Sequence, residues 1–211
     1  MDATFWIDRW AVGKIAFHEG NANTYLSRHV ERLGEARRIL VPLCGKAEDL
    51  AYLAGRGHHV VGVELVEDAA RAFFAEHGAT PDVRPRGAFT AYSAGTITIL
   101  VGDMFATTPE VLGPVDALYD RAALVALPPD MRARYARHLR TLLPSGAPGL
   151  VVTLEYDQSR IDGPPFAVLE AELREHYRGL TVEFLSHGPS VVTKFRDAGI
   201  EGKDRCFFVR Y

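Results

Sequence analysis

The sequence has few of the features that mark secreted or membrane proteins. Its 211 residues contain only two cysteines. Cys44 lies in a candidate ligand loop and Cys206 in a late strand-like run, so we expect no structural disulfide and a reducing compartment. No apolar run approaches membrane-spanning length, and Asp2, Asp8 and Arg9 interrupt the N-terminus, so neither a membrane span nor a signal peptide is predicted. The expected location is the cytoplasm.

An excess of one sign of charge is also missing. The formal net charge is −3, from 24 Lys and Arg against 27 Asp and Glu, which favours neither nucleic acid nor a membrane surface as a partner. The densest basic stretch, 132–140, is interpreted as the solvated face of a helix, because a nucleic-acid site needs cations converging on one surface. Apolar residues make up 47% and charged residues 24% of the chain. Such a composition suits one globular domain over 1–211, and nothing in it requires more than a monomer.

Several catalytic signatures are absent. The sequence has no G-x-S-x-G run and no G-K-[ST] phosphate loop, which argues against a hydrolase and a nucleotide kinase. His58 and His59 have no partner at ligand spacing, and no two histidines are four residues apart. We therefore expect no metal site.

The sequence does contain a run typical of nucleoside-binding α/β sheets. The apolar segment 39–43 leads into a loop with a single glycine, Gly45, and a second apolar segment, 60–63, ends on Glu64. In such sheets the loop meets one end of the ligand, and an acid about 20 residues further on bonds the ribose hydroxyls. Dinucleotide-binding loops need three glycines to approach a pyrophosphate. A nucleoside without phosphates, such as S-adenosylmethionine (SAM), is therefore the better candidate.

Strands alternate with helices along the chain, which predicts an α/β fold, a doubly wound and mostly parallel sheet. Residues 4–34 are aromatic-rich and predicted to be helical, 81–87 is predicted to be a loop, and the adjacent strands at the end of the chain predict an antiparallel hairpin, typical of SAM-dependent methyltransferases. The predicted strands are 39–43, 59–64, 89–92, 96–101, 116–119, 150–156, 182–187 and 206–211, and the predicted helices are 46–56, 68–77, 128–143 and 169–177.

The first candidate site residues lie at the ends of the first two strands. Glu64 follows Val60-Val61-Gly62-Val63, so its carboxylate is placed to accept both ribose hydroxyl protons, although a surface glutamate is the alternative. Leu43 is expected to offer its backbone to the ligand. Cys44 is interpreted as a small buried hydrophobe, since no histidine adjacent in sequence would make a thiolate of it.

Two further loops follow strand-like runs. In Gly102-Asp103-Met104-Phe105, Asp103 would lie near the adenine amine and Met104 against the ring; the alternative is an aspartate that caps the turn at 107–109. Asp120 and Arg121 could pair with each other. Alternatively, Arg121 faces an anion, either the SAM carboxylate or a thiolate acceptor.

The N-terminal aromatic residues suggest a cover for the site. Trp6, Trp10, Phe17 and His18 could be core anchors of a helix, or could form a movable lid that excludes water from the reaction. Trp10 is predicted to contact the cofactor, because aromatic ring faces attract cations such as a sulfonium.

Taken in order, these motifs resemble the bacterial form of the thiopurine S-methyltransferase family over nearly the whole chain. The Pro-Leu-Cys-Gly-Lys run at 42–46 is the most specific of them. The segments that carry the resemblance are Phe5-Trp6, Arg9-Trp10, Phe17-His18, Val41–Lys46, Gly62–Glu64, Gly102–Phe105, Asp120–Leu124 and Gly163–Phe166.

The resemblance implies a seven-stranded SAM-dependent methyltransferase fold in which residues 1–35 form an N-terminal helical lid. It implies SAM contacts at Trp10, Leu43, Glu64 and Arg121, with Asp103 and Met104 near the adenine. Phe17 would border the acceptor pocket, and Arg196 resembles a position that reaches acceptors.

The implied reaction is methyl transfer to an aromatic or heterocyclic thiol, such as a thiopurine, or physiologically to selenium or tellurium compounds. Alignment, exclusion of water and a cation near the acceptor sulfur are then sufficient, so no nucleophile–base pair is required. As a hypothesis, Arg121 or Arg196 favours the thiolate and Asp120 orients Arg121.

Three alternatives stay open at this point. A related halide or thiol methyltransferase shares the fold but not, as far as it can be matched, the Pro-Leu-Cys-Gly-Lys run. An NAD-dependent reductase would also use Glu64, although the single-glycine loop counts against it. A SAM-binding module without activity is the third, and the intact aromatic and arginine positions argue against it.

Overall fold

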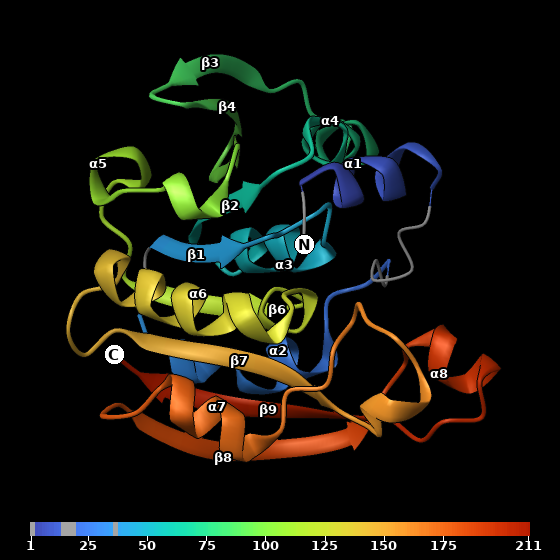
Figure 1. The fold of residues 1–211 in the computed structure, drawn as a ribbon. Helices are drawn as coiled ribbons and strands as arrows, with labels where there is room; N and C mark the ends of the chain where they lie inside the picture. Colours follow the sequence, from blue (N-terminus) through green and yellow to red (C-terminus); the bar gives the residue numbers. More distant parts are fainter. Residues whose placement is uncertain (1–2, 14–19, 36–37) are drawn as a thin grey trace.

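A nine-stranded sheet runs through the residues that the computed structural model describes, which are 3–13, 20–35 and 38–211 (Figure 1). Its strand order is β3-β4-β5-β2-β1-β6-β7-β9-β8. The central strands β5, β2, β1, β6 and β7 are parallel, and the strands outside them pair antiparallel. The strands are β1 (Arg38–Pro42), β2 (His59–Glu64), β3 (Asp82–Arg86), β4 (Phe89–Ala94), β5 (Ile97–Val101), β6 (Ala117–Arg121), β7 (Pro148–Glu155), β8 (Thr181–Pro189) and β9 (Lys203–Arg210).

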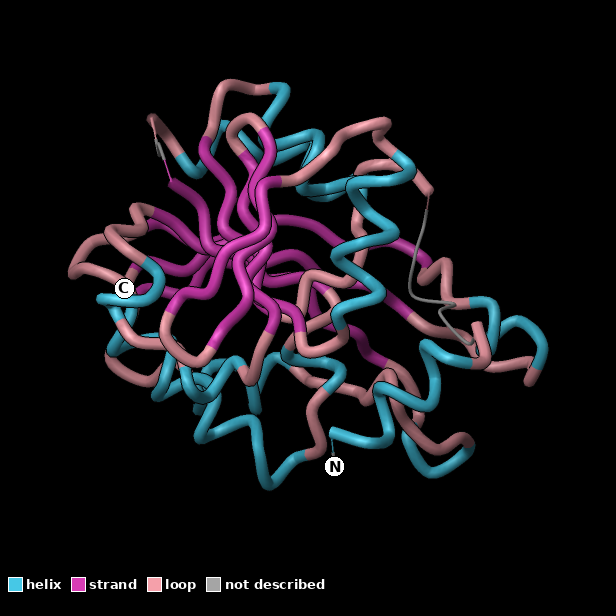
Figure 2. The backbone as a smooth tube through the Cα atoms, turned by 90° about the horizontal axis from the view of Figure 1, so that it is seen from above, coloured by secondary structure: helices cyan, strands magenta, loops and turns pink. Residues whose placement is uncertain are grey.

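Helices cover both faces of the sheet, as the view in Figure 2 shows. One face packs side chains of α6 and α7 into a first apolar cluster, and the other packs α2, α3 and α4 into a second. Strands that are buried on both faces consist of consecutive apolar residues, and for this reason β1 and β2 could be predicted from the sequence. The helices are α1 (Ala3–Ala11), α2 (Thr24–His29), α3 (Glu48–Gly55), α4 (Glu67–Glu76), α5 (Pro109–Leu112), α6 (Pro129–Leu142), α7 (Glu170–His176) and α8 (Thr193–Asp197).

The predicted α/β architecture with a helical N-terminal region is confirmed. The number of strands was wrong: the described residues form nine rather than seven, and half of the strand pairings are antiparallel. The residue pattern itself predicted eight strands, and it missed β3 because 81–87 was predicted to be a loop. Residues 82–86 instead pair with β4. Their side chains are exposed or half-buried, so the segment lacks the buried apolar pattern by which strands are recognised.

The order of the strands creates a crevice above β1. From β1 the chain proceeds to β2 on one side, and later returns to β6 on the other side. Ligands in open α/β sheets bind at such a switch point, outside the carboxyl ends of the strands. No helix among the described residues is long and apolar enough to cross a membrane, and both cysteines are free and buried.

A buried polar cluster supports the opposite face of β6. The Asp120 side chain is fully buried; its Oδ2 accepts a hydrogen bond of 2.8 Å from the Tyr135 hydroxyl on α6, and its Oδ1 accepts one of 3.1 Å from the Leu124 backbone N–H. Burial raises the pKa of Asp120 from 3.8 to about 6, against the opposing effect of these two donors. A carboxyl whose pKa is higher in the folded than in the unfolded chain stabilises the fold when protonated.

This raised pKa predicts a pH-dependent contribution to stability. Protonated Asp120 contributes fully below about pH 4, and the contribution is lost as the pH rises through about 6. Two pKa units correspond to about 3 kcal/mol at most. Asp120→Asn removes this titration, so the free energy of unfolding of the variant, relative to the wild type, should rise by up to that amount between pH 4 and pH 7.5, measured by urea unfolding.

Asp157→Asn provides a control of opposite sign. The exposed Asp157 carboxylate accepts hydrogen bonds from Ser159, which lower its pKa. Removing it should therefore cost stability at the higher pH rather than at the lower. An Asp120→Asn difference from wild type that is the same at both pH values would contradict the assignment.

Candidate active site

A cavity of about 1670 Å³ opens at the carboxyl ends of the parallel strands. A pocket for one drug-sized molecule measures roughly 300–1,000 Å³, so this cavity has room for two small molecules at once. Its walls come from α1, from the loops that follow β1, β2, β5, β6 and β7, and from a C-terminal segment at 191–198. The site therefore brings together most of the loops in which candidate residues were predicted.

The loop after β1 is held close to β2. The Cys44 backbone N–H donates a hydrogen bond of 3.1 Å to the Val63 carbonyl, and the Cys44 side chain packs over Gly62, where an added Cβ would lie 2.6 Å from the sulfur. Burial raises the pKa of the Cys44 thiol well above its usual value, and the negative charge of the nearby Glu64 carboxylate raises it further. Cys44 is thus a buried packing residue, as predicted.

Two residues that line the cavity adopt left-handed backbone conformations. Leu43 has φ +47° and Ala122 has φ +61°, and they are the only non-glycine residues with positive φ in the described part of the chain. They follow the adjacent strands β1 and β6. A side chain in this conformation costs about 1–3 kcal/mol, and such strain gathers at functional sites.

Glu64 lies at the end of β2 and joins two loops. Its Oε2 accepts a hydrogen bond from the Gly45 backbone N–H and its Oε1 accepts one from the Val66 backbone N–H, both of 2.8 Å. The residue is only 7% exposed and lines the cavity. Burial raises the pKa of Glu64, and the backbone donors Val66, Gly45 and Leu65 oppose the rise. A carboxylate has about four acceptor positions, so these backbone donors leave room for a ligand hydroxyl.

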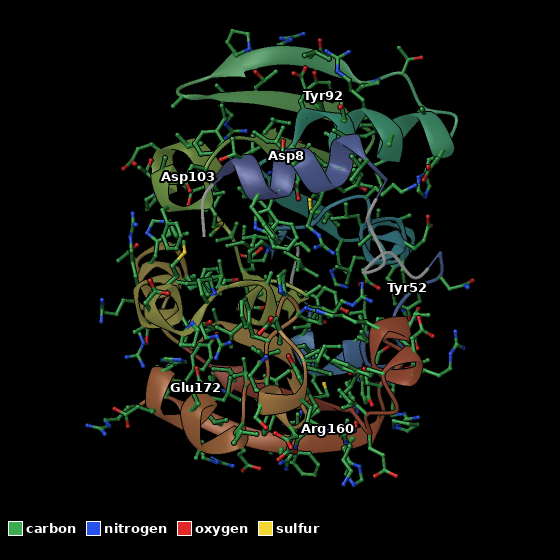
Figure 3. The ribbon with its side chains drawn as sticks, turned by 45° about the vertical axis from the view of Figure 1, so that its right-hand side comes forward. Asp8, Tyr52, Tyr92, Asp103, Arg160 and Glu172 are labelled. Atoms are coloured by element: carbon green, nitrogen blue, oxygen red, sulfur yellow. The ribbon has the colours of Figure 1, made fainter. Side chains whose placement is uncertain are left out.

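Asp103 and Met104, the two residues predicted to lie near the adenine, line the cavity after β5. Met104 is buried. Asp103, labelled in Figure 3, is exposed, and its carboxylate accepts a hydrogen bond of 2.9 Å from the Phe105 backbone N–H. Asp103 thereby caps the short 3₁₀ helix Met104–Ala106, while Thr108 caps α5. Asp103 is therefore a capping residue, as the alternative predicted, but it caps the turn at 104–106 rather than the turn at 107–109.

Arg121 lies at the end of β6 beside a buried acid that the sequence did not single out. Its Nη1 is 4.0 Å from Asp49 Oδ2, and its side chain is 12% exposed. Asp49, in the first turn of α3, also accepts hydrogen bonds from the Asn23 backbone N–H (2.6 Å) and the Tyr119 hydroxyl (3.1 Å). The acid ties the end of the N-terminal segment to β6 and balances part of the Arg121 charge.

The predicted catalytic role of Asp120 is not supported by its position. Asp120 and Arg121 are successive residues of a strand, so their side chains point to opposite faces. Arg121 lines the cavity, whereas both oxygens of Asp120 are bonded to Tyr135 and Leu124 outside the cavity wall. Asp120 therefore joins β6 to Tyr135 on α6 and does not line the cavity.

The N-terminal helix α1 forms one wall of the cavity through Trp6, Arg9 and Trp10, the last of which was predicted to contact the cofactor. Phe17 lies outside the described residues. Arg196, predicted to reach the acceptor, lies on α8 with its side chain 80% exposed and its Nε 3.8 Å from Asp197 Oδ1, and it is not among the described residues that line the cavity. Its neighbours Lys194 and Asp197 do line it.

Sequence reasoning missed two buried polar residues here. Asp49 carried a weak signal, an acid in the first turn of a helix, but its direction depends on how α3 packs. Thr153 interrupts the apolar run 150–154 of β7; it lines the cavity, is 1% exposed, and its hydroxyl has no hydrogen-bond partner among the described residues. The sequence marked Thr153 only as one hydroxyl residue within an otherwise apolar predicted strand.

The arrangement fits a phosphate-free nucleoside. The first loop offers closely approaching backbone, a buried carboxylate has acceptor positions to spare, and Met104 offers an apolar surface. These are the groups that a sugar and an adenine require. Among the described residues, no group of three or more His, Cys, Asp or Glu could hold a metal ion.

Comparison with known structures supports the fold. A 1,6-didemethyltoxoflavin-N1-methyltransferase of Burkholderia thailandensis, solved with S-adenosylhomocysteine bound, superposes with a TM-score of 0.65 at 18% identity, covering 99% of this chain and 87% of that one. A SAM-dependent methyltransferase of Archaeoglobus fulgidus gives 0.58 at 14% identity, covering 89% and 91%. At these identities, the likeness establishes the architecture alone.

Comparison of sequences defines the family. The model of the thiopurine S-methyltransferase family matches residues 1–206. Thiopurine S-methyltransferase of Pseudomonas paraeruginosa is 49% identical over 214 aligned positions, 99% of this chain and 98% of that protein. The enzyme of the same name from Azotobacter vinelandii is 52% identical over 176 positions, 82% and 81% of the two chains. The chain therefore belongs to the thiopurine S-methyltransferase family, and is a SAM-dependent methyltransferase rather than a reductase.

Proposed function

We propose that this chain methylates the sulfur of aromatic and heterocyclic thiols, with thiopurines as suitable acceptors. The observation that carries the proposal is Arg121, a cation 12% exposed on the central strand β6, where the cavity is wide enough for cofactor and acceptor together. A guanidinium in a partly dry cavity favours an anionic acceptor. The relatives named thiopurine S-methyltransferase support the same acceptor class.

The residues at the ends of β1, β2 and β5 would hold the cofactor. Glu64 would accept the ribose hydroxyls, Leu43 would offer backbone groups, and Asp103 and Met104 would flank the adenine. When bound, SAM supplies a methyl group on a positively charged sulfur, which is left as a neutral thioether after transfer. The electrostatic match between this charge and the ring face of Trp10 supports a cofactor contact from α1.

Arg121 would lower the pKa of the acceptor thiol, whose proton passes to solvent before the sulfur attacks. The thiolate then needs only alignment and a dry site, so no general base is required. Asp49 limits the repulsion between Arg121 and a sulfonium, because it places a negative charge 4.0 Å from the guanidinium. Arg121 would therefore act on the acceptor, and Asp49 would position it.

The N-terminal segment 1–35 would act as the lid of the single domain 1–211. Trp6 and Trp10 form a cavity wall on α1, and the Asn23 N–H to Asp49 bond fixes the point where this segment joins the sheet. A helix so placed can exclude water from the reacting atoms. The buried free cysteines support the proposed cytoplasmic location, and a monomer suffices for a site built from one chain.

The first test is turnover. Purified protein with SAM should convert 6-mercaptopurine to its S-methyl product together with S-adenosylhomocysteine, measured by chromatography with mass detection. Selenols and tellurite belong in the same screen, because the resemblance to bacterial relatives favours them as physiological acceptors. Halide ions serve as a negative control for the halide methyltransferase alternative. Transfer to halide but to no thiol would refute the proposal.

Glu64→Gln should weaken cofactor binding. The amide can accept fewer hydrogen bonds and turns a donor toward Gly45 or Val66, both of which already donate. A bond to a charged group is worth about 1.5–3 kcal/mol, which predicts a roughly 10–100-fold higher dissociation constant for S-adenosylhomocysteine by calorimetry. Glu110→Gln, at an exposed position on α5, should leave it unchanged. Equal affinities for both variants would remove Glu64 from the cofactor site.

Arg121→Ala should lower kcat/KM for thiols roughly 10–100-fold near neutral pH, since one preorganised charged donor is lost. The loss should shrink at a pH well above the acceptor pKa, where the thiolate forms unaided. Arg121→Lys keeps the charge and should retain part of the activity. Thermal melting checks that loss of the cation beside the buried Asp49 carboxylate has not unfolded the variant. A pH–rate profile like that of the wild type would contradict this role.

A further inference from the structure

A hydrogen-bonded relay from α6 holds the turn that follows β5. The Thr107 hydroxyl donates a bond of 2.7 Å to the Met104 carbonyl, and His138 Nε2 on α6 lies 2.9 Å from the same hydroxyl oxygen. Met104 lines the cavity, whereas Thr107, which is 2% exposed, and His138 are not among the described residues that line it. In this α6 relay (His138, Thr107 and Met104), the first two residues would therefore act on a ligand only through the third.

The geometry fixes the direction of the relay. A hydroxyl has one proton and a carbonyl can only accept, so the Thr107 proton points toward the Met104 carbonyl. The hydroxyl oxygen must then accept from His138, whose ring has to carry a proton on Nε2. Burial lowers the pKa of His138, against the opposing effect of the Met104 carbonyl. The ring is therefore mostly neutral near pH 7, and its single proton is the one on Nε2.

A second contact from the same side of α6 reaches this turn. Arg134 precedes His138 by four residues, a spacing that places both side chains on one side of a helix. The guanidinium carbon of Arg134 lies 4.1 Å from the centre of the Phe105 ring, and the Phe105 and His138 rings are 6.1 Å apart. The 3₁₀ helix Met104–Ala106 has only three residues and makes few bonds of its own, so these contacts contribute to its position.

We propose that Thr107 and His138 are positioning residues for base recognition, because they fix the turn that holds Asp103 and Met104 against the adenine. The inference rests on the proposed function, in which Asp103 lies near the adenine amine and Met104 lies against the ring. A carboxylate accepts hydrogen bonds from an amine but repels a carbonyl oxygen, so a correctly placed Asp103 selects adenine over a base with a carbonyl there. Loss of the relay lets the turn move and weakens this selection.

The test compares S-adenosylhomocysteine with S-inosylhomocysteine, in which a carbonyl replaces the adenine amine. The wild type should bind the adenine compound more tightly, measured by calorimetry. Thr107→Val removes the donor to Met104 and should raise the dissociation constant of S-adenosylhomocysteine about five- to tenfold, the size of one neutral hydrogen bond. The value for S-inosylhomocysteine should change less than about twofold, because Asp103 makes no favourable contact with its base. Thr107→Ser keeps the hydroxyl and should bind both compounds like the wild type.

Substitutions of His138 test the direction of the relay. His138→Leu should reproduce the effect of Thr107→Val, whereas His138→Gln carries an N–H where the ring has Nε2 and should restore most of the preference. In the wild type at pH 7.5, nitrogen NMR should show the His138 ring protonated on Nε2 and not on Nδ1. A ring protonated on Nδ1 alone would overturn the relay.

Thr108 provides a matched control one residue further along the chain. Its side chain accepts a hydrogen bond of 3.3 Å from the Val111 N–H and caps α5, and it is not among the described residues that line the cavity. Thr108→Val should lower the melting temperature through loss of the cap, yet leave the preference between the two compounds unchanged. The comparison separates a loss of stability from a loss of positioning.

The relay and the proposed function fail in different ways. Equal changes in both dissociation constants, or no change in either, would overturn the role of the relay while leaving thiol methylation intact. A wild type without a preference between the two compounds would refute the adenine placement at Asp103 and the inference with it. A preference that narrows in Thr107→Val, in a protein that methylates no thiol, would refute the proposed function and keep the relay.

Discussion

The site depends on one buried carboxylate that joins two loops. Glu64 ends β2 and accepts hydrogen bonds of 2.8 Å from Gly45, in the loop after β1, and from Val66, at the start of α4. Such charge-assisted bonds are strong in a dry environment. The same residue keeps β5 in place, because the Gly102 N–H donates to the Glu64 carbonyl at 2.8 Å. The carboxylate is therefore set in position before any ligand arrives.

Several residues near Glu64 adopt conformations or environments that cost folding free energy. Leu43 and Ala122 adopt left-handed conformations on either side of the switch point, and Gly62 leaves the space that the Cys44 side chain fills. The buried Thr153 hydroxyl, which has no hydrogen-bond partner among the described residues, and the Asp49–Arg121 pair at 4.0 Å add further buried polar groups near the cavity. A folded protein keeps such unfavourable features where a ligand benefits from them, whereas the two apolar clusters on the faces of the sheet supply the compensating stability.

Much of the fold was predictable because its signals are local. The central parallel strands are buried on both faces, so their positions follow from continuous apolar runs, and the helices between them from their periodicity. The motif 42–46 with Glu64 identified both the switch point and a ligand without phosphates. By contrast, β3 was missed: its exposed residues pair only through the backbone with β4, and backbone pairing leaves little trace in the side-chain pattern.

The sequence by itself determined the class of the protein, the order of its central elements and the loops that meet at the site. The loops were predictable because those that follow parallel strands all lie at the same edge of the sheet. Only the tertiary structure decided which side chains face the cavity. Arg121 lines it and Asp120 does not, Arg196 turns to solvent, and Asp49 bonds Asn23 and Tyr119, which lie 26 and 70 residues away along the chain. The physical reason is that a strand's pleat, a helix's rotation and contacts over such separations are set by packing, which no local pattern of residues encodes.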